Sequence, residues 1–470
     1  MSRELWAHNA TSLAGLIAQR AVSSTEVVRA HLERIETVNP LLNAVVVVCA
    51  AEALADARHA DDCLARGEVV GPLHGVPVTI KENIDVAGTA TTDGLVSRAR
   101  DVAARDAPAV ERLRGAGAIV LGRTNLPDMG LRISTDSSLH GLTRNPWHRG
   151  RTAGGSSGGE AAAIAAGMSP LGLGNDIGGS LRNPAHCCGI AAIKPTPGRV
   201  ATESPTSTLA AQLMAATGPL ARGIDDLALA LSLLCGPHPR DPTALPLPPP
   251  EGAGPARRIA LLADPPGGTT DPGVAAVVRA AGRHLEHGGY VVEELEPPGF
   301  VEATDIWRAL MAADIRAAHL VDSPEIGDAG RQVLAALLER EHEIDLARYL
   351  SLFVRRRALQ RSWFALFATH PVIVLPVWTA VAFPHGFDAD GPQHAAAATD
   401  LSRPVVPANL LGLPAVSVPG GLAQGMPVGV QCVAAPYREA DALAAAATIE
   451  AAVGALTPVD PFVTVDSPRP

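Results

Sequence analysis

Residues 172–184 read GLGNDIGGSLRNP and lead from a short strand into a serine, Ser180, that follows two glycines. The strand is expected to end near Ile177. Gly178 and Gly179 then let several successive backbone N–H groups point into one concavity. Such a nest of amides can hold the negative oxygen of a tetrahedral intermediate. The segment matches only half of the GxGxxG pattern of dinucleotide-binding proteins, so a dinucleotide site is the poorer interpretation.

A second glycine-rich segment, TAGGSSGGE at residues 152–160, carries a pair of serines. A flexible loop is one interpretation. A phosphate-binding loop would need the ending GK[ST], which is missing. Gly155, Ser157 and Gly159 fit the G-x-S-x-G nucleophile elbow, but that motif needs a strand directly before the serine. The preceding residues 145–153, NPWHRGRTA, do not have the pattern of a strand, which argues against the elbow.

A lysine stands at the end of a third segment of interest, LHGVPVTIKENID at residues 73–85. Val78 and Ile80 alternate with Thr79 and Lys81, which predicts a strand that turns Lys81 away from the apolar face. Two interpretations stay open for this side chain. Its amine lies in water at a strand end, or it lies in a dry site where desolvation lowers its pKa and leaves neutral amine to act as a base.

Taken together, the three segments predict a Ser–Ser–Lys constellation: a lysine base, a glycine-flanked serine and a second serine beside a nest of amides. None of the fifteen histidines lies in a comparable motif, so no Ser–His–Asp arrangement is supported. No metal-ligand spacing is present, and neither a metal nor a cofactor is expected. The six cysteines form no CxxC pair, so neither a zinc site nor a disulfide framework is predicted.

These motifs resemble those of the amidase signature family, and the resemblance covers nearly the whole chain. The matching stretches are GVPVTIKENIDVAG, GRTNLPDMG, GLTRNPWHRGRTAGGSSGGEAAAIAAG, GLGNDIGGSLRNPAHCCGIAAIKPT, LLGLPAVSVPGG and MPVGVQCV. The resemblance implies that Lys81 is the catalytic lysine. It also implies that Ser156, in a cis peptide, is the bridging serine and that Ser180 is the nucleophile.

Two further assignments come from the same resemblance. The oxyanion hole is expected at the backbone of Ile177, Gly178, Gly179 and Ser180. The turn at Met129 and Gly130 is expected to line the acyl pocket and bind substrate.

The order of elements predicts an α/β fold, a single large domain over residues 1–470 with a central mixed β-sheet covered by helices on both faces. A capping box at Ser23 and Glu26 predicts a helix that Asn39-Pro40 should stop. The first fifty residues are otherwise expected to be helical, and a helix is predicted over Val102–Gly117. Later helices are predicted from Asp271-Pro272 to Gly288 and over Glu439–Val453, and late strands over Val372–Leu375, Ala415–Val418 and Val428–Val433.

Three regions of that domain are distinguished by composition and by the motifs. The signature core spans about 70–200, a Pro-rich surface linker about 237–255, and a variable, mostly helical substrate-pocket region about 300–380. The large side chains of the last region are expected to serve mainly in the core: Trp307, Met311, Phe353, Trp363, Phe364 and Trp378.

Composition excludes several classes of function. The net charge is −10 and no basic run is interleaved with aromatic residues, so no nucleic-acid partner is expected. The N-terminal residues lack a signal-peptide pattern, and no stretch is long and apolar enough to span a membrane. A cytoplasmic enzyme acting on a small-molecule amide, as a monomer or homodimer, is the resulting expectation.

The expected activity is hydrolysis of amide bonds through an acyl-enzyme on Ser180, with neutral, fairly apolar amides or anilides as substrates. Esters and aryl carbamates are further candidates. Arg182 is expected to pair with Asp176, and no arginine is marked by a motif as the partner of a substrate carboxylate, although Arg308, Arg316 and Arg355–Arg357 could supply a charge. Two alternatives stay open: a glutaminase component of a tRNA-dependent amidotransferase, and a non-catalytic binding protein that keeps the fold.

Overall fold

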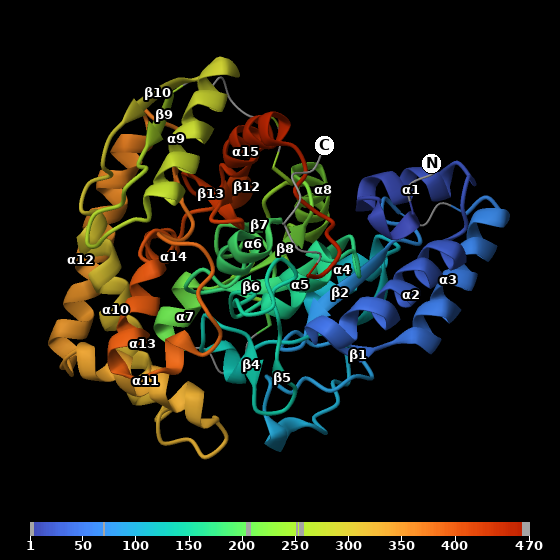
Figure 1. Cartoon of the computed structure of the whole chain (residues 1–470), viewed down its shortest axis with the longest axis horizontal. Coiled ribbons are helices and arrows are strands. Elements are labelled where there is room, and N and C mark those ends of the chain that lie inside the picture. Colours follow the sequence, from blue (N-terminus) through green and yellow to red (C-terminus); the bar gives the residue numbers. More distant parts are fainter. Residues whose placement is uncertain (1–3, 69–70, 204–207, 251, 253–257, 463–470) are drawn as a thin grey trace.

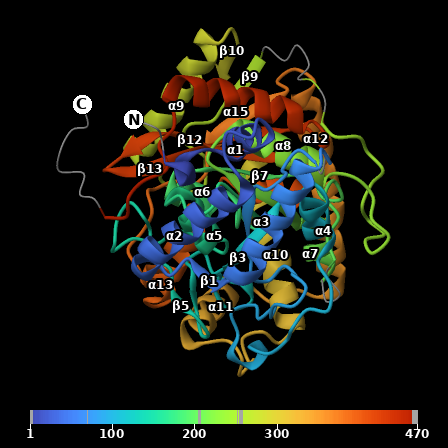
Figure 2. The same cartoon turned by 90° about the vertical axis from the view of Figure 1, so that its right-hand side faces the viewer.

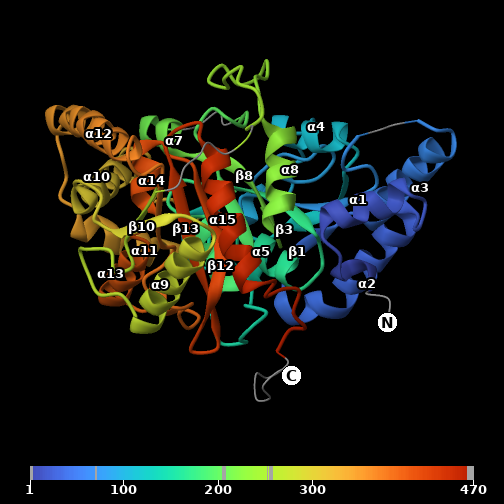
Figure 3. The ribbon, with the colours of Figure 1, turned by 90° about the horizontal axis from the view of Figure 1, so that it is seen from above.

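A mixed sheet of eleven strands crosses the part of the chain that the computed structural model describes, which is residues 4–68, 71–203, 208–250, 252 and 258–462 (Figure 1). The strand order is β1-β3-β2-β6-β8-β7-β12-β13-β11-β9-β10, and β4 and β5 form a separate small ribbon. Helices cover both faces of the sheet (Figures 2 and 3). The predicted α/β class with a covered mixed sheet is confirmed.

The strands are β1 Val45–Val48, β2 Pro77–Lys81, β3 Ile119–Thr124, β4 Asp136–Ser137, β5 Gly141–Leu142, β6 Leu171–Asp176, β7 Ala191–Lys194, β8 Ala216–Ala221, β9 Arg258–Leu261, β10 Val291–Glu294, β11 Val372–Pro376, β12 Ala415–Ala423 and β13 Met426–Ala434. The α-helices are α1 Ala10–Ala18, α2 Ser24–Leu42, α3 Ala50–Ala65, α4 Pro108–Gly115, α5 Gly158–Ala165, α6 Arg182–Cys188, α7 Leu209–Met214, α8 Ile224–Leu234, α9 Pro272–His287, α10 Phe300–Ala317, α11 Asp328–Arg340, α12 Leu346–Phe367, α13 Pro392–Leu401, α14 Val406–Leu411 and α15 Glu439–Val453. Short 3₁₀ turns are η1 Leu5–Ala7, η2 Val96–Arg98, η3 Asp128–Gly130 and η4 Phe387–Ala389.

Strand alternation sorts the core into two layers. In β11, Val372 and Val374 join the cluster that packs under α8, α9 and α15, whereas Ile373 and Leu375 join the cluster under α10, α12 and α14. Successive side chains of a strand point to opposite faces, which produces this division. In β2 the same rule sends Val78 into the first cluster and leaves Lys81 on the other side of the sheet.

Three expectations about the N-terminal part were wrong. Helix α2 continues through Pro40 to Leu42, because a proline in the last turn costs little when Asn43 closes the helix in the left-handed conformation with its N–H bonded to the Asn39 carbonyl. Residues 45–48, VVVV, are a strand and not helix, as a run of β-branched residues favours. The helix predicted from Val102 begins only at Pro108, which takes the first helical position.

Other expectations agree with the structure. The capping box of Ser23 and Glu26 is present, and Asp271 accepts hydrogen bonds at the start of α9. α15 and the three late strands form where they were predicted, with the strands extended at their ends. The described part of the 237–255 linker, residues 237–250 and 252, has no helix or ladder strand, and its other residues lie outside the described part. None of the helices in the described residues is long and apolar enough to cross a membrane.

Candidate active site

Parallel pairing of β2 with β6 builds the site from segments about ninety residues apart. Thr79 pairs with Gly172 and Ile80 with Leu173, so the carboxyl ends of both strands meet at one edge of the sheet. Ligands of α/β proteins bind at such edges. Here Lys81, the last residue of β2, donates from Nζ to Oδ1 of Asn175 in β6 at 2.7 Å.

The Lys81 side chain is fully buried, so its amine does not lie in bulk water. Burial lowers the pKa of Lys81 to about 7, while the carboxylates of Asp93, Asp176 and Glu160 act in the opposite direction. Half of the amine is therefore neutral near pH 7. Of the two interpretations left open by the sequence, the structure favours the dry site.

Ser156 contacts that amine directly, since Lys81 Nζ and Ser156 Oγ lie 2.7 Å apart. The peptide bond between Gly155 and Ser156 is cis. Thr135 braces the loop by donating from Oγ1 to the Gly154 carbonyl at 2.8 Å and accepting from the Gly158 N–H at 3.1 Å.

The loop is also packed tightly on both sides. A Cβ added to Gly155 would lie 2.6 Å from the Arg132 carbonyl oxygen, and one added to Gly154 would lie 2.7 Å from Pro184 Cα. Only glycine allows such close approach of backbone. Residues 145–156, all of them described, contain no ladder strand that could lead into Ser157, so the nucleophile-elbow alternative is excluded.

Ser180 lies on the turn between β6 and α6 and is 8% exposed. Its carbonyl accepts a hydrogen bond from Ser157 N–H at 3.2 Å, which ties this turn to the Ser156 loop. Gly179 has φ +101°, which a residue with a Cβ rarely adopts. Its N–H donates to Asp176 Oδ1 at 2.8 Å, so this one of the four amides predicted for the oxyanion hole is already bonded.

A buried ion pair fixes the turn that carries Ser180. Arg182 donates from Nε and Nη2 to both carboxylate oxygens of Asp176, at 3.0 and 2.9 Å, as the sequence predicted for this pair. Burial alone would raise the pKa of Asp176, but the Arg182 guanidinium outweighs it and holds that pKa well below the usual range. Arg182 also donates to the Val405 carbonyl and to Asn409 Oδ1, which fastens the turn to α14.

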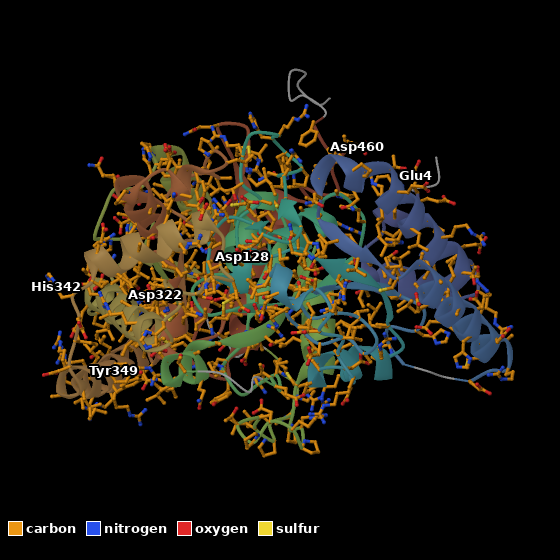
Figure 4. All side chains as sticks on the ribbon, turned by 90° about the horizontal axis from the view of Figure 1, so that it is seen from below. Glu4, Asp128, Asp322, His342, Tyr349 and Asp460 are labelled. Atoms are coloured by element: carbon orange, nitrogen blue, oxygen red, sulfur yellow. The ribbon has the colours of Figure 1, made fainter. Side chains whose placement is uncertain are left out.

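The turn predicted to bind substrate lies beside the same loop. Met129 has φ 52°, and a Cβ on Gly130 would lie 3.2 Å from Ser156 Oγ. The neighbouring Asp128 accepts from the N–H groups of Ser138 and Gly327 at 2.7 Å each. Figure 4 labels Asp128 near the middle of the view, between the N-terminal helices and the helices of residues 300–367. Substrate binding by Met129 and Gly130 stays a prediction.

Comparison with known proteins agrees with this arrangement. The family model described as Amidase matches residues 26–443. The chain belongs to the amidase signature family. An indoleacetamide hydrolase of Bradyrhizobium diazoefficiens is 40% identical over 96% of this chain and 88% of its own length. The amidase component of the glutamyl-tRNA(Gln) amidotransferase of Moorella thermoacetica is 34% identical over 95% and 97%. A bacterial aryl acylamidase of the amidase signature family has a TM-score of 0.83 and 25% identity, over 95% of this chain and 96% of that one. As an amidase signature protein, the chain is an enzyme that hydrolyses amide C–N bonds, and the non-catalytic alternative is withdrawn.

Three polar residues of this amidase were missed by the sequence reasoning. Asn175 accepts from Lys81 and donates to Asn83 Oδ1 at 3.0 Å. Asp93 is the first of the charged groups that act on Lys81, and burial raises the pKa of Glu160 to about 7. Nothing local marks these residues, because their proximity to Lys81 depends on which strands and turns become neighbours.

A metal is not suggested by the arrangement of side chains. Within the described residues, no three His, Cys, Asp or Glu side chains form a group that could hold a metal ion. The predicted triad consists of an amine and two hydroxyls, which is a proton-transfer set and not a ligand set for zinc.

Replacing Asp93 with Asn should move the acid limb of the kcat/KM profile to lower pH. The carboxylate raises the pKa of Lys81, so its loss lets that pKa fall and leaves more neutral amine at a given pH. Asn tolerates the φ of 54° at this position. The matched control is Asp101→Asn, because Asp101 is the other partner of Arg98, at 3.1 Å, and is not among the groups acting on Lys81. An unchanged limb, or one moved to higher pH, would contradict the assignment of Lys81 as the titrating base.

Replacing Asn175 with Asp should have the opposite effect. A carboxylate in contact with Nζ raises a lysine pKa by about 1–3 units, so the acid limb should move to higher pH by a comparable amount. Asn175→Ser removes the amide without adding charge and should not move the limb upward. The pair of profiles, recorded at constant ionic strength, separates charge from packing, and a limb that stays in place in N175D would refute direct contact with the base.

Proposed function

We propose that this chain hydrolyses neutral, largely apolar carboxamides through an acyl-enzyme on Ser180. The observation that carries the proposal is the 2.7 Å contact between Ser156 Oγ and the buried amine of Lys81, whose pKa burial lowers to about 7. A neutral amine in contact with a hydroxyl can take its proton at physiological pH, which activates a serine without histidine.

In the proposed cycle, Lys81 takes a proton from Ser156 while Ser156 takes one from Ser180. Ser180 Oγ forms a bond to the substrate carbonyl carbon, and the oxyanion lies against the backbone amides of the turn. The C–N bond breaks as the relay returns the proton to the leaving amine. Water then attacks the acyl-enzyme, loses its proton to the relay and releases the acid with Ser180 restored.

The amides of Ile177, Gly178 and Ser180 are the donors proposed for the oxyanion. The fourth, Gly179, is bonded to the buried carboxylate of Asp176 and serves to hold the turn. Three converging donors are ample, since loss of a single one typically costs about 10²–10³ in kcat.

Substrate charge is restricted by the state of the arginines. Arg182 is engaged by Asp176, and Arg308 by Asp305, Glu341 and Asp400. Arg316 and Arg356 donate to backbone carbonyls, Arg355 to Glu302 and Arg357 to Gln360. Every arginine that the sequence offered for a substrate carboxylate therefore has a partner. A substrate without a carboxylate fits this site better.

The names of the similar proteins point the same way. An indoleacetamide is a neutral primary amide with an aromatic acyl part, and an aryl acylamidase is named for acylated aryl amines, which are anilides. We therefore place arylacetamides first, anilides second, and esters and aryl carbamates after them, since all pass through the same tetrahedral oxyanion.

A second candidate is glutaminase activity within an amidotransferase, which the 34% identity to the Moorella amidotransferase component supports. Such activity would appear or rise strongly only with partner proteins. Measurement of ammonia release from glutamine by the isolated chain distinguishes the two functions.

Comparison of kcat/KM across four substrates tests the proposal. Indole-3-acetamide should exceed glutamine by at least about tenfold, the discrimination that a few apolar contacts supply. An anilide and an aryl carbamate complete the panel, and Ser180→Ala, checked for an unchanged fold by circular dichroism, is the blank. A preference for glutamine would overturn the substrate assignment, and undiminished turnover by S180A would overturn the nucleophile.

Replacing Lys81 with Ala should slow amide hydrolysis by about 10²–10⁴, the usual contribution of a general acid–base group. The loss for an ester with the same acyl part should be smaller by about tenfold, because an alkoxide needs protonation less than an amine does. The matched control is Lys194→Ala, since Lys194 is a second buried lysine whose Nζ donates to the Pro195 carbonyl and not to a serine. Equal losses on amide and ester in K81A would argue against proton relay by Lys81.

A further inference from the structure

One aromatic side chain from the variable helical region contacts the predicted oxyanion turn. Trp307, in α10, donates from Nε1 to the Ile177 carbonyl at 3.0 Å. A Cβ on Gly178 would lie only 2.6 Å from the Cζ2 atom of the same indole. The ring thus bonds to one residue of the turn and lies against the next. The sequence had suggested that Trp307 serves mainly as a core residue.

We propose that Trp307 is a positioning residue that sets the direction of the Gly178 N–H toward the oxyanion, an inference that rests on the proposed function. In a planar trans peptide, the carbonyl and the N–H point in opposite directions. Anchoring the Ile177 oxygen to the indole therefore holds the Gly178 N–H on the opposite side of the same peptide plane. The bond also polarises that peptide, which strengthens its N–H as a donor.

Two glycines of the turn are then required for different reasons. Gly179 needs its positive φ, whereas Gly178 has no positive φ and needs the space that the indole occupies. The sequence alone marks the pair Gly178–Gly179 as a flexible nest. Its first member is a contact surface for Trp307, which lies 130 positions after Ile177 in the chain.

Packing alone is the competing explanation. Trp307 is partly buried and borders two apolar clusters, so its loss could simply loosen α10. A packing role predicts a lower melting temperature and similar losses for all ligands. A positioning role predicts a loss confined to states with a negative oxygen at the turn.

The experiment compares Trp307→Phe with Trp363→Phe. Trp363 is the matched control, because its Nε1 donates to the Pro298 carbonyl at 2.9 Å in the α10–α12 core and its indole N–H is not bonded to the turn. W307F should lower kcat roughly tenfold, less than direct loss of an oxyanion donor, with KM changed by less than about twofold. W363F should lower the melting temperature and leave kcat within about twofold.

A ligand pair supplies the second measurement. An arylboronic acid forms a tetrahedral adduct with the serine, and its inhibition should weaken in W307F by about the same factor as kcat/KM. Binding of the arylacetic acid product should change little. If W307F does not unfold cooperatively, Trp307→Met is used and read in the same way.

Three outcomes would overturn the proposal: kcat of W307F within twofold of wild type, a loss of kcat no greater than in W363F, or equal weakening of boronate and product. Failure of the underlying function is distinguishable, because S180A would then retain turnover and the boronate would not inhibit the wild-type enzyme.

Discussion

A buried amine without a carboxylate in contact is the constraint on which the site depends. Among the described residues, Lys81 forms no ion pair, and its Nζ bonds to the neutral oxygens of Ser156 and Asn175. A contacting carboxylate would raise the pKa of Lys81 and keep it charged. The carboxylates nearby are restrained instead: Asp176 is paired with Arg182, and burial raises the pKa of Glu160 to about 7. Lys194 is also buried, with a pKa lowered by burial to about 7, but it meets a backbone carbonyl. A depressed pKa is therefore not enough, and the adjacent hydroxyl makes the difference.

The pair of Asp176 and Arg182 explains why the chain acts as one unit. Breaking a buried pair costs about 3–5 kcal/mol because one charge is left without a partner. Here the guanidinium also bonds to Gln431 and Asn409, on β13 and α14, so the turn bearing Ser180 is fixed by residues far along the chain. Asn409 returns a hydrogen bond to Asp176 at 2.9 Å, which closes the network. The strand that leads into the catalytic turn, β6, and the strand that carries Gln431, β13, lie in the same continuous sheet.

Local patterns predicted the elements better than the contacts between them. The alternation of Val78 and Ile80 with Lys81 predicted a strand, and the capping box at Ser23 predicted the start of α2, because both depend on neighbours in sequence. The end of α2 was predicted wrongly because the rule for Pro40 ignores where in the helix the proline stands. Asn175 and Asp93 were missed because their contact with Lys81 follows from the parallel pairing of β2 with β6 and from a distant turn. A single sequence does not encode such pairings in a readable period.

Separation of catalytic signature from variable pocket is less complete in the structure than in the sequence. The helical region is attached to the signature at two points, where Trp307 bonds to the Ile177 carbonyl and where Asp128 accepts from the Gly327 N–H. The first of these contacts reaches the turn that bears the nucleophile. A shift of α10 made to admit a different acyl group would therefore move the indole against Gly178 and tilt the peptide that faces the oxyanion. Substrate preference and catalytic rate are coupled through this one interface, since a misplacement of about 1 Å can cost about 10²-fold in rate.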